Sequence, residues 1–389
     1  HCFYFTAMLT NPLFFLLLFL ASGPAFGQAP LKGIVVNAET GAPVPAASLF
    51  LSNTSTGTTA AADGRFTLML PAGRYDLVVS SVGYQTHTQN INTSQVTESI
   101  TIKLLPRAQE LETVVVEPFE KNGWEKWGKF FIENFIGHSD LAPQCVIKNT
   151  DVIKCRHNKT ENKLAVTALE PLVIENRSLG YNVIYQLEGF SYDFKTHYLL
   201  YQGYPFFQPM KGGAARQRRW AAQRKDVYEG SIMHFMRSLY RNTLVQEGFQ
   251  LHAVEKITNW EKQRIQAAKK LYMQHVVNSN GSISMVDNTP EDSAGYYNRI
   301  LAQADVFDKI SRHQLTGDSI AYAVNTTTAG LAFDNYLLVI YTKKTAPQAY
   351  VRQFPKSGTA MASQITLLNQ NGVEVLANGS FYSPLDLMS

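Results

Sequence analysis

The sequence has few cysteines, little net charge and only one long apolar run. It contains 3 cysteines in 389 residues and carries a formal net charge of +4. Such a small charge does not by itself indicate a nucleic-acid-binding protein, so electrostatic arguments must come from local clusters. The rest of the composition, 45% hydrophobic and 17% charged, is ordinary for a globular chain, and its length predicts two or three domains.

The sequence also lacks a complete catalytic motif. Neither His-Glu-x-x-His nor Gly-x-Ser-x-Gly occurs. His252 and Glu255 have the His-x-x-Glu spacing of the first two zinc ligands in a metallo-carboxypeptidase. The third ligand would be a histidine much farther along the chain, but the only later histidines are His275 and His313. We therefore predict no metal site, no cofactor and no enzymatic activity.

The apolar run lies at the N-terminus, from Leu13 to Ala21, and small residues follow it up to Gly27. Although no Lys or Arg precedes it, this arrangement is typical of a secretory signal, and the run is too short to span a bilayer. Residues 1–27 are therefore predicted to be a signal peptide for export to the periplasm or outer membrane. No later segment is apolar for long enough to cross a membrane, and no cysteine stands directly after the run to carry a lipid.

Export places the chain in an oxidising compartment, where disulfides persist. Cys145 and Cys155 flank "VIKNTDVIK", in which Asn149, Thr150 and Asp151 are turn formers. A hairpin with this three-residue loop would place the two cysteines opposite each other, within disulfide range. The alternative is two buried thiols, and two cysteines without nearby histidines make a poor zinc site.

Residues 28–105 alternate between short strands and turn residues. In "RFTLML" and "ITIKL" every second residue is apolar, which indicates strands with one buried face. Asp63-Gly64 is a strong hairpin signal between two of them. Six or seven such strands in about 80 residues predict a small β-sandwich that folds as its own domain.

The stretch from Gly33 to Tyr84 resembles a known family. Thr40-Gly41 with Pro43, the turn at Gly64 followed by Phe66, and Gly83-Tyr84 are similar to the carboxypeptidase-regulatory-like domain, a transthyretin-like sandwich. The resemblance covers about residues 29–105 and implies a non-catalytic domain joined to variable partners. "LETVVVEP" is similar to a segment of TonB-dependent receptors that carry this domain, but the chain is too short for their barrel.

Residues 106–118 are predicted to be a linker, and residues 119–389 a mixed α+β domain. A helix is expected in "EKNGWEKWGKFFIENFIG", residues 120–137, because its aromatic residues recur every three or four positions, and Gly137 would end it. Strands rich in Tyr, Ile and Val follow up to Phe207. Their aromatic residues predict a core face, with a glycan-binding face as the alternative.

A basic cluster follows these strands. Its members surround one tryptophan and are Lys211, Arg216, Arg218, Arg219, Trp220, Arg224 and Lys225. Guanidinium groups match phosphates, acidic sugars and acidic proteins, so we predict an anion-binding or partner-binding surface, with Trp220 either packed on the sheet or stacked under an arginine. The alternative is an ordinary solvated helix face. After it, Ser231 is expected to cap a second helix that runs to Gly248.

The second part of the chain is similar to exported Bacteroidota proteins that combine the regulatory-like sandwich with an uncharacterised α+β domain. The similar stretches include "FIGHSDLAPQCVIKN" and "YRNTLVQEGF". Similar chains continue beyond Ser389, so a truncated C-terminus is expected. The resemblance implies no catalytic residues.

Two functions therefore stay open. The first is a non-catalytic binding or scaffold protein of the cell envelope, with an envelope protein or glycan, and no nucleic acid, as its partner. The second is an envelope hydrolase that acts on glycans or peptides and uses carboxylates such as Glu170, Glu175 and Glu188. Such an enzyme needs two carboxylates that face each other at about 5–10 Å.

Overall fold

The fold was analysed in a computed structural model, which describes residues 29–93, 95, 99–107, 118–277, 283–353, 358–368, 372–381 and 387–388. The predicted signal peptide and most of the predicted linker, residues 108–117, lie outside this part. The chain divides into two compact units, His1–Gln223 and Arg224–Ser389. The division falls within the segment 119–389 that was expected to be one domain, and the predicted domain boundaries stay predictions.

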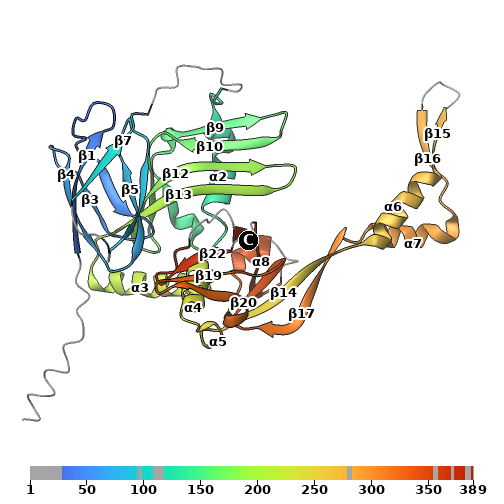
Figure 1. Ribbon diagram of the computed structural model, residues 1–389. Helices are drawn as coiled ribbons and strands as arrows, with labels where there is room; N and C mark the ends of the chain where they lie inside the picture. The colour runs from blue at the N-terminus through green and yellow to red at the C-terminus, as the bar shows by residue number, and fades with distance from the viewer. Residues whose placement is uncertain are drawn as a thin grey trace, which may run out of the picture. The chain divides into compact units, whose positions relative to one another are not determined.

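The first unit begins with the predicted β-sandwich (Figure 1). Its strands are β1 (Ala29–Asn37), β2 (Ser48–Leu51), β3 (Gly57–Thr59), β4 (Arg65–Leu70), β5 (Arg74–Ser80), β6 (His87–Asn92) and β7 (Ile100–Leu104). They form two sheets, with the orders β4-β1-β7 and β3-β2-β5-β6. In β4 the predicted alternation is confirmed, since Phe66, Leu68 and Leu70 are buried in the core while Thr67 and Met69 are exposed.

The predicted hairpin at Asp63-Gly64 is wrong. Strand β3 pairs with β2, whereas β4 pairs with β1, so the turn leads from one sheet to the other. Gly64 has a φ of +76° and supplies the sharp bend that the turn signal indicated. The local signal therefore identified the bend but not the partner of each strand, because the partner is chosen by the packing of the two sheets.

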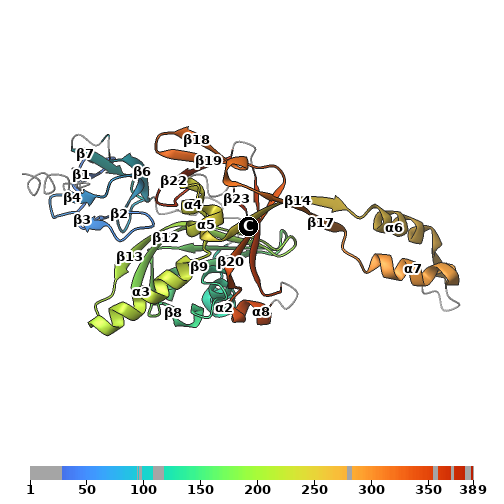
Figure 2. The same ribbon diagram turned by 90° about the horizontal axis from the view of Figure 1, so that it is seen from below.

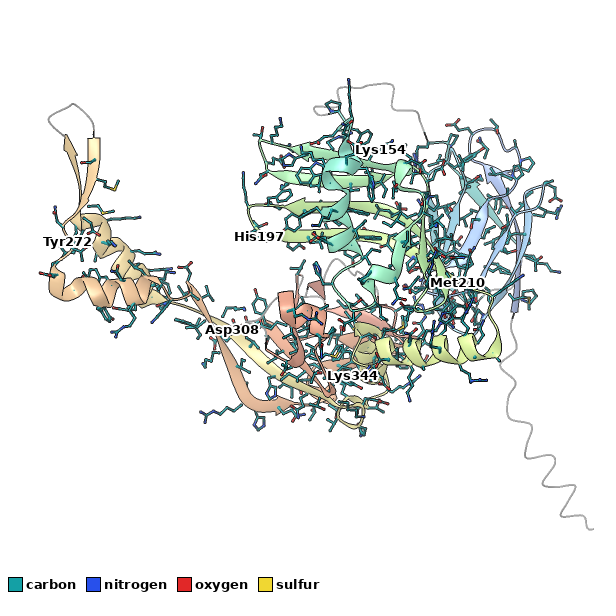
Figure 3. The ribbon with its side chains drawn as sticks, turned by 180° about the vertical axis from the view of Figure 1, so that it is seen from behind. Lys154, His197, Met210, Tyr272, Asp308 and Lys344 are labelled. Atoms are coloured by element: carbon teal, nitrogen blue, oxygen red, sulfur yellow. The ribbon has the colours of Figure 1, made fainter. Side chains whose placement is uncertain are left out.

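The second part of this unit is a six-stranded antiparallel sheet. Its strands are β8 (Cys145–Ile147), β9 (Ile153–Asn158), β10 (Lys163–Ala168), β11 (Leu172–Asn176), β12 (Tyr181–Asp193) and β13 (Tyr198–Pro209). Along one edge β12 pairs with β11 and then with β10, and along the other it pairs with β13 over its whole length. Figure 3 marks the two ends of β13 with His197 and Met210. Together with the sandwich, this sheet confirms the predicted mainly β fold with an α+β part.

Helix α2 (Gly123–Phe135) lies within the segment 120–137 that was predicted to be helical. Phe131 is fully buried and its ring lies 5.0 Å from the rings of Phe135 and Phe190. Tyr185 of β12 meets Phe135 edge-on at the same distance. The aromatic residues of α2 and of this face of the sheet therefore form a core, as the first of the two predictions stated. Figure 2 shows α2 beside this sheet.

The second unit is built on the sheet β17-β14-β20-β21-β23. Its strands and those of the small sheet β18-β19-β22 are β14 (Phe249–Thr258), β17 (Val306–Leu315), β18 (Ala321–Asn325), β19 (Thr328–Leu331), β20 (Tyr336–Thr345), β21 (Ala360–Leu367), β22 (Val373–Leu376) and β23 (Leu387–Met388). Its core includes Phe235, Met236 and Leu239 of helix α4 (Ile232–Tyr240). A short helix α8 (Gln348–Gln353) follows β20.

The helix expected from Ser231 to Gly248 is divided into two. Ser231 caps α4 as predicted, because its hydroxyl accepts a hydrogen bond from the His234 backbone N–H. Asn242 has a φ of +53° and interrupts the helix. A single further turn, α5 (Leu244–Glu247), then ends at Gly248, whose φ is +97°. The stop at Gly248 is confirmed, but the continuous helix is wrong because Asn242 adopts a left-handed conformation.

An insertion joins the far ends of β14 and β17 (Figure 1). It consists of α6 (Trp260–Tyr272), β15 (Met273–Val277), β16 (Ile283–Asp287) and α7 (Glu291–Leu301). Ile265 and Ile300 are buried in it, whereas Trp260 is 70% exposed. Within the described ranges, no helix combines the length and the apolar character needed to cross a bilayer.

Candidate anion-binding surface

The predicted basic cluster lies on and next to helix α3 (Ala214–Tyr228), which crosses the boundary between the two units. Trp220 is its only buried residue, with 3% of its surface exposed. The indole Nε1–H donates a 2.9 Å hydrogen bond to the carbonyl oxygen of Arg177, in the turn between β11 and β12. Trp220 therefore packs against the sheet as an anchor, which was one of the two roles predicted for it.

The packing of Trp220 against the sheet requires a glycine in that turn. Gly180 has a φ of +67°, and a Cβ atom there would lie 2.2 Å from the indole ring. Its carbonyl oxygen also accepts a hydrogen bond from the backbone N–H of Met210, which precedes α3. Sequence reasoning identified Trp220 but missed Gly180, although the turn-forming run "NRSLG" was a signal for a tight turn beside the strand.

Three arginines in the N-terminal half of α3 lie at the surface of the helix. Arg216, Arg218 and Arg219 are exposed, and their side chains form no hydrogen bond or ion pair with any group in the described part of the chain. The guanidinium carbon of Arg216 lies 6.0 Å from the centre of the Trp220 ring, at the outer limit of a cation–π contact. The three positive charges are therefore available to solvent.

The two ends of α3 differ in charge. The first turn contains no acidic residue, so the partial positive charge of the helix N-terminus adds to that of the nearby arginines. Near the other end, Lys225 lies 3.9 Å from Glu229 and Asp226 pairs with Lys344 at 2.7 Å. Acidic residues therefore balance the positive charges at the C-terminal end of α3. The N-terminal half carries an excess of positive charge, which would attract an anion.

The other three basic residues of the predicted cluster lie at its margins. Lys211 is exposed and precedes α3, whereas Arg224, which is only partly exposed, and the exposed Lys225 belong to the second unit. We therefore call Arg216, Arg218 and Arg219 the arginine surface and treat Trp220 as its anchor. The binding role of this surface stays a prediction.

The predicted cysteine hairpin is wrong. Cys145 lies in β8, which pairs with β11, and Cys155 lies in β9, which pairs with β10. These strands stand at the two ends of the order β8-β11-β12-β10-β9, and both thiols are free. Residues 150–152 form a helical turn instead of a hairpin loop, so the geometry on which the disulfide prediction rested is absent.

The free thiol of Cys155 is fully buried beneath the start of α2. Burial, together with the nearby negative charge of Glu120, raises the pKa of Cys155 to about 11. The partly buried thiol of Cys145 also has a raised pKa because of its burial. Both cysteines therefore remain protonated at neutral pH, which makes them weak nucleophiles and weak metal ligands.

The carboxylates considered for catalysis have separate surroundings. Glu175 lies 3.1 Å from Arg177 and 3.6 Å from Lys148, and the hydrogen bond from Arg177 holds the pKa of Glu175 below its usual range. Glu170 lies in the exposed loop between β10 and β11, and Glu188 is exposed at an irregularity of β12. The described contacts thus assign Glu175 to ion pairs with its cationic neighbours.

The His-x-x-Glu pair lies in β14. The His252 Nδ1–H donates a hydrogen bond to the carbonyl oxygen of Ser311, and Glu255 pairs with Lys309 at 3.2 Å. Each residue thus has its own partner on β17. Among the residues that the structure describes, no group of three or more His, Cys, Asp or Glu side chains is arranged to hold a metal ion.

The first domain matches a known family. Residues 31–116 match the family model of the CarboxypepD_reg-like domain, which confirms the resemblance predicted for about residues 29–105. The match covers less than half of the chain and contains none of the residues of the arginine surface. No curated protein matches the sequence.

Three solved structures show partial likeness. A catechol 1,2-dioxygenase from Acinetobacter is 14% identical and has a TM-score of 0.17; the match covers 22% of this chain and 55% of the dioxygenase. A DUF3823 family protein from Bacteroides ovatus is 11% identical with a TM-score of 0.17, over 90% of this chain and 99% of its own. A Bacteroides fragilis protein of unknown function is 11% identical with a TM-score of 0.18, and the match covers 82% of this chain and 88% of that protein. TM-scores this low support no argument about this protein.

Proposed function

We propose that this protein is a non-catalytic binding or scaffold protein of the cell envelope, and that its arginine surface holds an acidic partner. One observation carries the proposal: Arg216, Arg218 and Arg219 are exposed on a helix with a single buried residue, and they form no ion pair with any described group. Like charges that are close together repel one another, with screening over about 8 Å at physiological salt. An acidic partner would remove this repulsion.

The location in the envelope is part of the proposal. It rests on the apolar run from Leu13 to Ala21 and on the small residues that follow it. Cell fractionation and sequencing of the mature N-terminus test it, with cleavage expected near Gly27. Recovery of the uncleaved chain from the cytosol would contradict it.

The binding role can be tested with a double charge reversal, Arg216→Glu with Arg219→Glu, in the full chain. The tagged protein is used to capture partners from the native envelope at increasing salt. We expect wild type to capture a partner whose binding weakens as salt rises, because screening reduces attraction between exposed charges. The variant is expected to lose this partner.

A matched control reverses two charges elsewhere. Arg312→Glu with Lys159→Glu gives the same change in net charge at two exposed positions, and it should keep the partner. Thermal melting of both variants accompanies the capture. Unchanged capture by the arginine variant would contradict the binding role. A clear loss of its stability would mean that the arginines serve the fold rather than a partner.

A further inference from the structure

A second candidate site lies inside the first unit, between the sandwich and the six-stranded sheet. The sandwich face that points away from its own core carries Phe50 of β2, whose ring stacks 5.2 Å from that of Phe206 in β13. Two backbone hydrogen bonds, from Asn53 N–H to Pro205 O and from Phe207 N–H to Thr54 O, join the turn after β2 to β13. The two sheets are therefore held together by an aromatic contact and by two backbone hydrogen bonds beside it.

Next to this contact the interface becomes polar. Ser48 and Ser80 are directly opposite each other in the β2–β5 ladder, and they share a face with Phe50 because side chains on a strand alternate. They line a pocket of about 170 Å³, together with Ser81 and Thr86 of the sandwich. The opposite wall comes from residues 169–171 and from Gln186 of β12.

Gln186 is the unusual member of this wall. Its neighbours Tyr185 and Leu187 pack in the core beneath α2, so the Gln186 side chain projects from the other face of β12, toward the sandwich. It is only 6% exposed, yet its Oε1 atom has no hydrogen-bond partner among the described protein groups. A buried amide oxygen without a partner is unfavourable for folding, so its presence in a pocket indicates a ligand group that completes it.

Both walls are held in place by the protein itself. On the sandwich side, the Arg107 N–H donates to Gly83 O and the Tyr84 N–H donates to Ser81 O. On the sheet side, the Arg107 guanidinium donates to Leu169 O and the Asn149 amide donates to Pro171 O. A pocket that is already shaped by such contacts costs little ordering when a ligand binds.

The chemistry of the lining selects the class of ligand. The more enclosed polar side chains of the lining are uncharged hydroxyls and one amide, each able to both donate and accept. The charged residues of the lining, Arg107 and Glu170, are exposed. A charged ligand would need an opposite charge in the enclosed part, whereas a ligand with several hydroxyl groups would match it. The volume is below the roughly 300–1,000 Å³ of sites for drug-sized ligands, which limits the ligand to about one sugar ring.

We infer that this pocket binds a single neutral sugar residue, free or at the end of a glycan, and that the Gln186 amide is its central hydrogen-bonding group. The site is separate from the arginine surface. It adds a neutral glycan ligand to a protein whose proposed partner is acidic.

The test uses the full chain and a panel of D-glucose, D-galactose, D-mannose and N-acetyl-D-glucosamine. Saturation-transfer NMR and calorimetric titration are expected to detect at least one sugar with a millimolar or tighter dissociation constant. In Gln186→Leu the same sugar should bind on the order of tenfold more weakly, because a buried hydrogen bond is lost. The melting temperature should stay the same or rise, since the amide that lacks a partner is gone.

Two control variants test whether the loss of sugar binding is specific to the pocket. Gln208→Leu makes the same change at an exposed position of β13 outside the pocket, and should bind like wild type. The double charge reversal at Arg216 and Arg219 should leave sugar binding unchanged, even if it removes the acidic partner. If Gln186→Leu has a lower melting temperature than wild type, Ser80→Ala is used in its place, and it should also bind the sugar more weakly. Failure of all four sugars to bind wild type, or equal binding by wild type and a folded pocket variant, would overturn the inference.

Discussion

Helices α2 and α3 belong to neighbouring parts of the chain and are attached in opposite ways. Helix α2 presents a row of aromatic residues to the sheet, with Phe131 fully buried among other rings. Helix α3 is two residues longer by its bounds, Ala214–Tyr228 against Gly123–Phe135, but buries only Trp220. The first helix is therefore part of the core. The second is an exposed basic helix on a single anchor, an arrangement that suits a surface for binding.

The largest effect is expected for Phe131→Ala. Removing this ring leaves a cavity among Phe135, Phe190 and the strands, which should cost about 3–5 kcal/mol in the free energy of unfolding. Chemical denaturation measures this loss. Ile132→Ala, at a neighbouring position that is 37% exposed, should cost about 0.5 kcal/mol or less. Equal losses for the two variants would contradict the description of α2 as a core helix.

A smaller global effect is expected for Trp220→Ala, about 3 kcal/mol or less, because α3 can detach without unfolding the sheet. Hydrogen exchange should show loss of protection confined to α3 and to the turn that contains Gly180. Trp220→Phe keeps the packing of a ring but loses the hydrogen bond to Arg177, so it should cost about 1 kcal/mol. Normal protection of α3 in Trp220→Ala would show that other contacts hold the helix.

The buried thiol beneath α2 predicts an alkaline loss of stability. Because the pKa of Cys155 is raised from 9.0 to about 11 in the folded chain, the protonated thiol favours the folded state. This contribution is complete below about pH 9 and is lost as the pH rises toward 11. The loss amounts to about 2.7 kcal/mol at most. Denaturation across this range should show a steeper decline for wild type than for Cys155→Ala, and parallel curves would refute the assignment.

The smallest change in stability is expected at the arginine surface. Arg216→Glu with Arg219→Glu should alter the free energy of unfolding by about 0.5 kcal/mol or less, since both side chains are exposed. Any change should be a gain, because like-charge repulsion falls and negative charge near a helix N-terminus is favourable. A loss that disappears at high salt would indicate internal ion pairs and would remove the contrast with α2.

Sequence patterns predicted those features that depend on residues close together in the chain. The alternation in β4, the aromatic spacing of α2, the cap at Ser231 and the stop at Gly248 were all predicted, because each reflects the period or the dihedral preference of a short segment. The sandwich was also recognisable, and the family match over residues 31–116 confirms it. The basic residues around Trp220 were likewise visible as a cluster.

Tertiary structure alone decided which distant segments meet. The turn at Asp63-Gly64 looked like a hairpin but joins two sheets, and Cys145 and Cys155 lie in strands at opposite ends of one sheet order. Trp220 packs against Gly180, although the two residues are far apart in the sequence. The pocket around Gln186 likewise brings distant segments together. Strand pairing and interface packing are set by the burial of whole faces against each other, and the local sequence of a strand does not specify its partner.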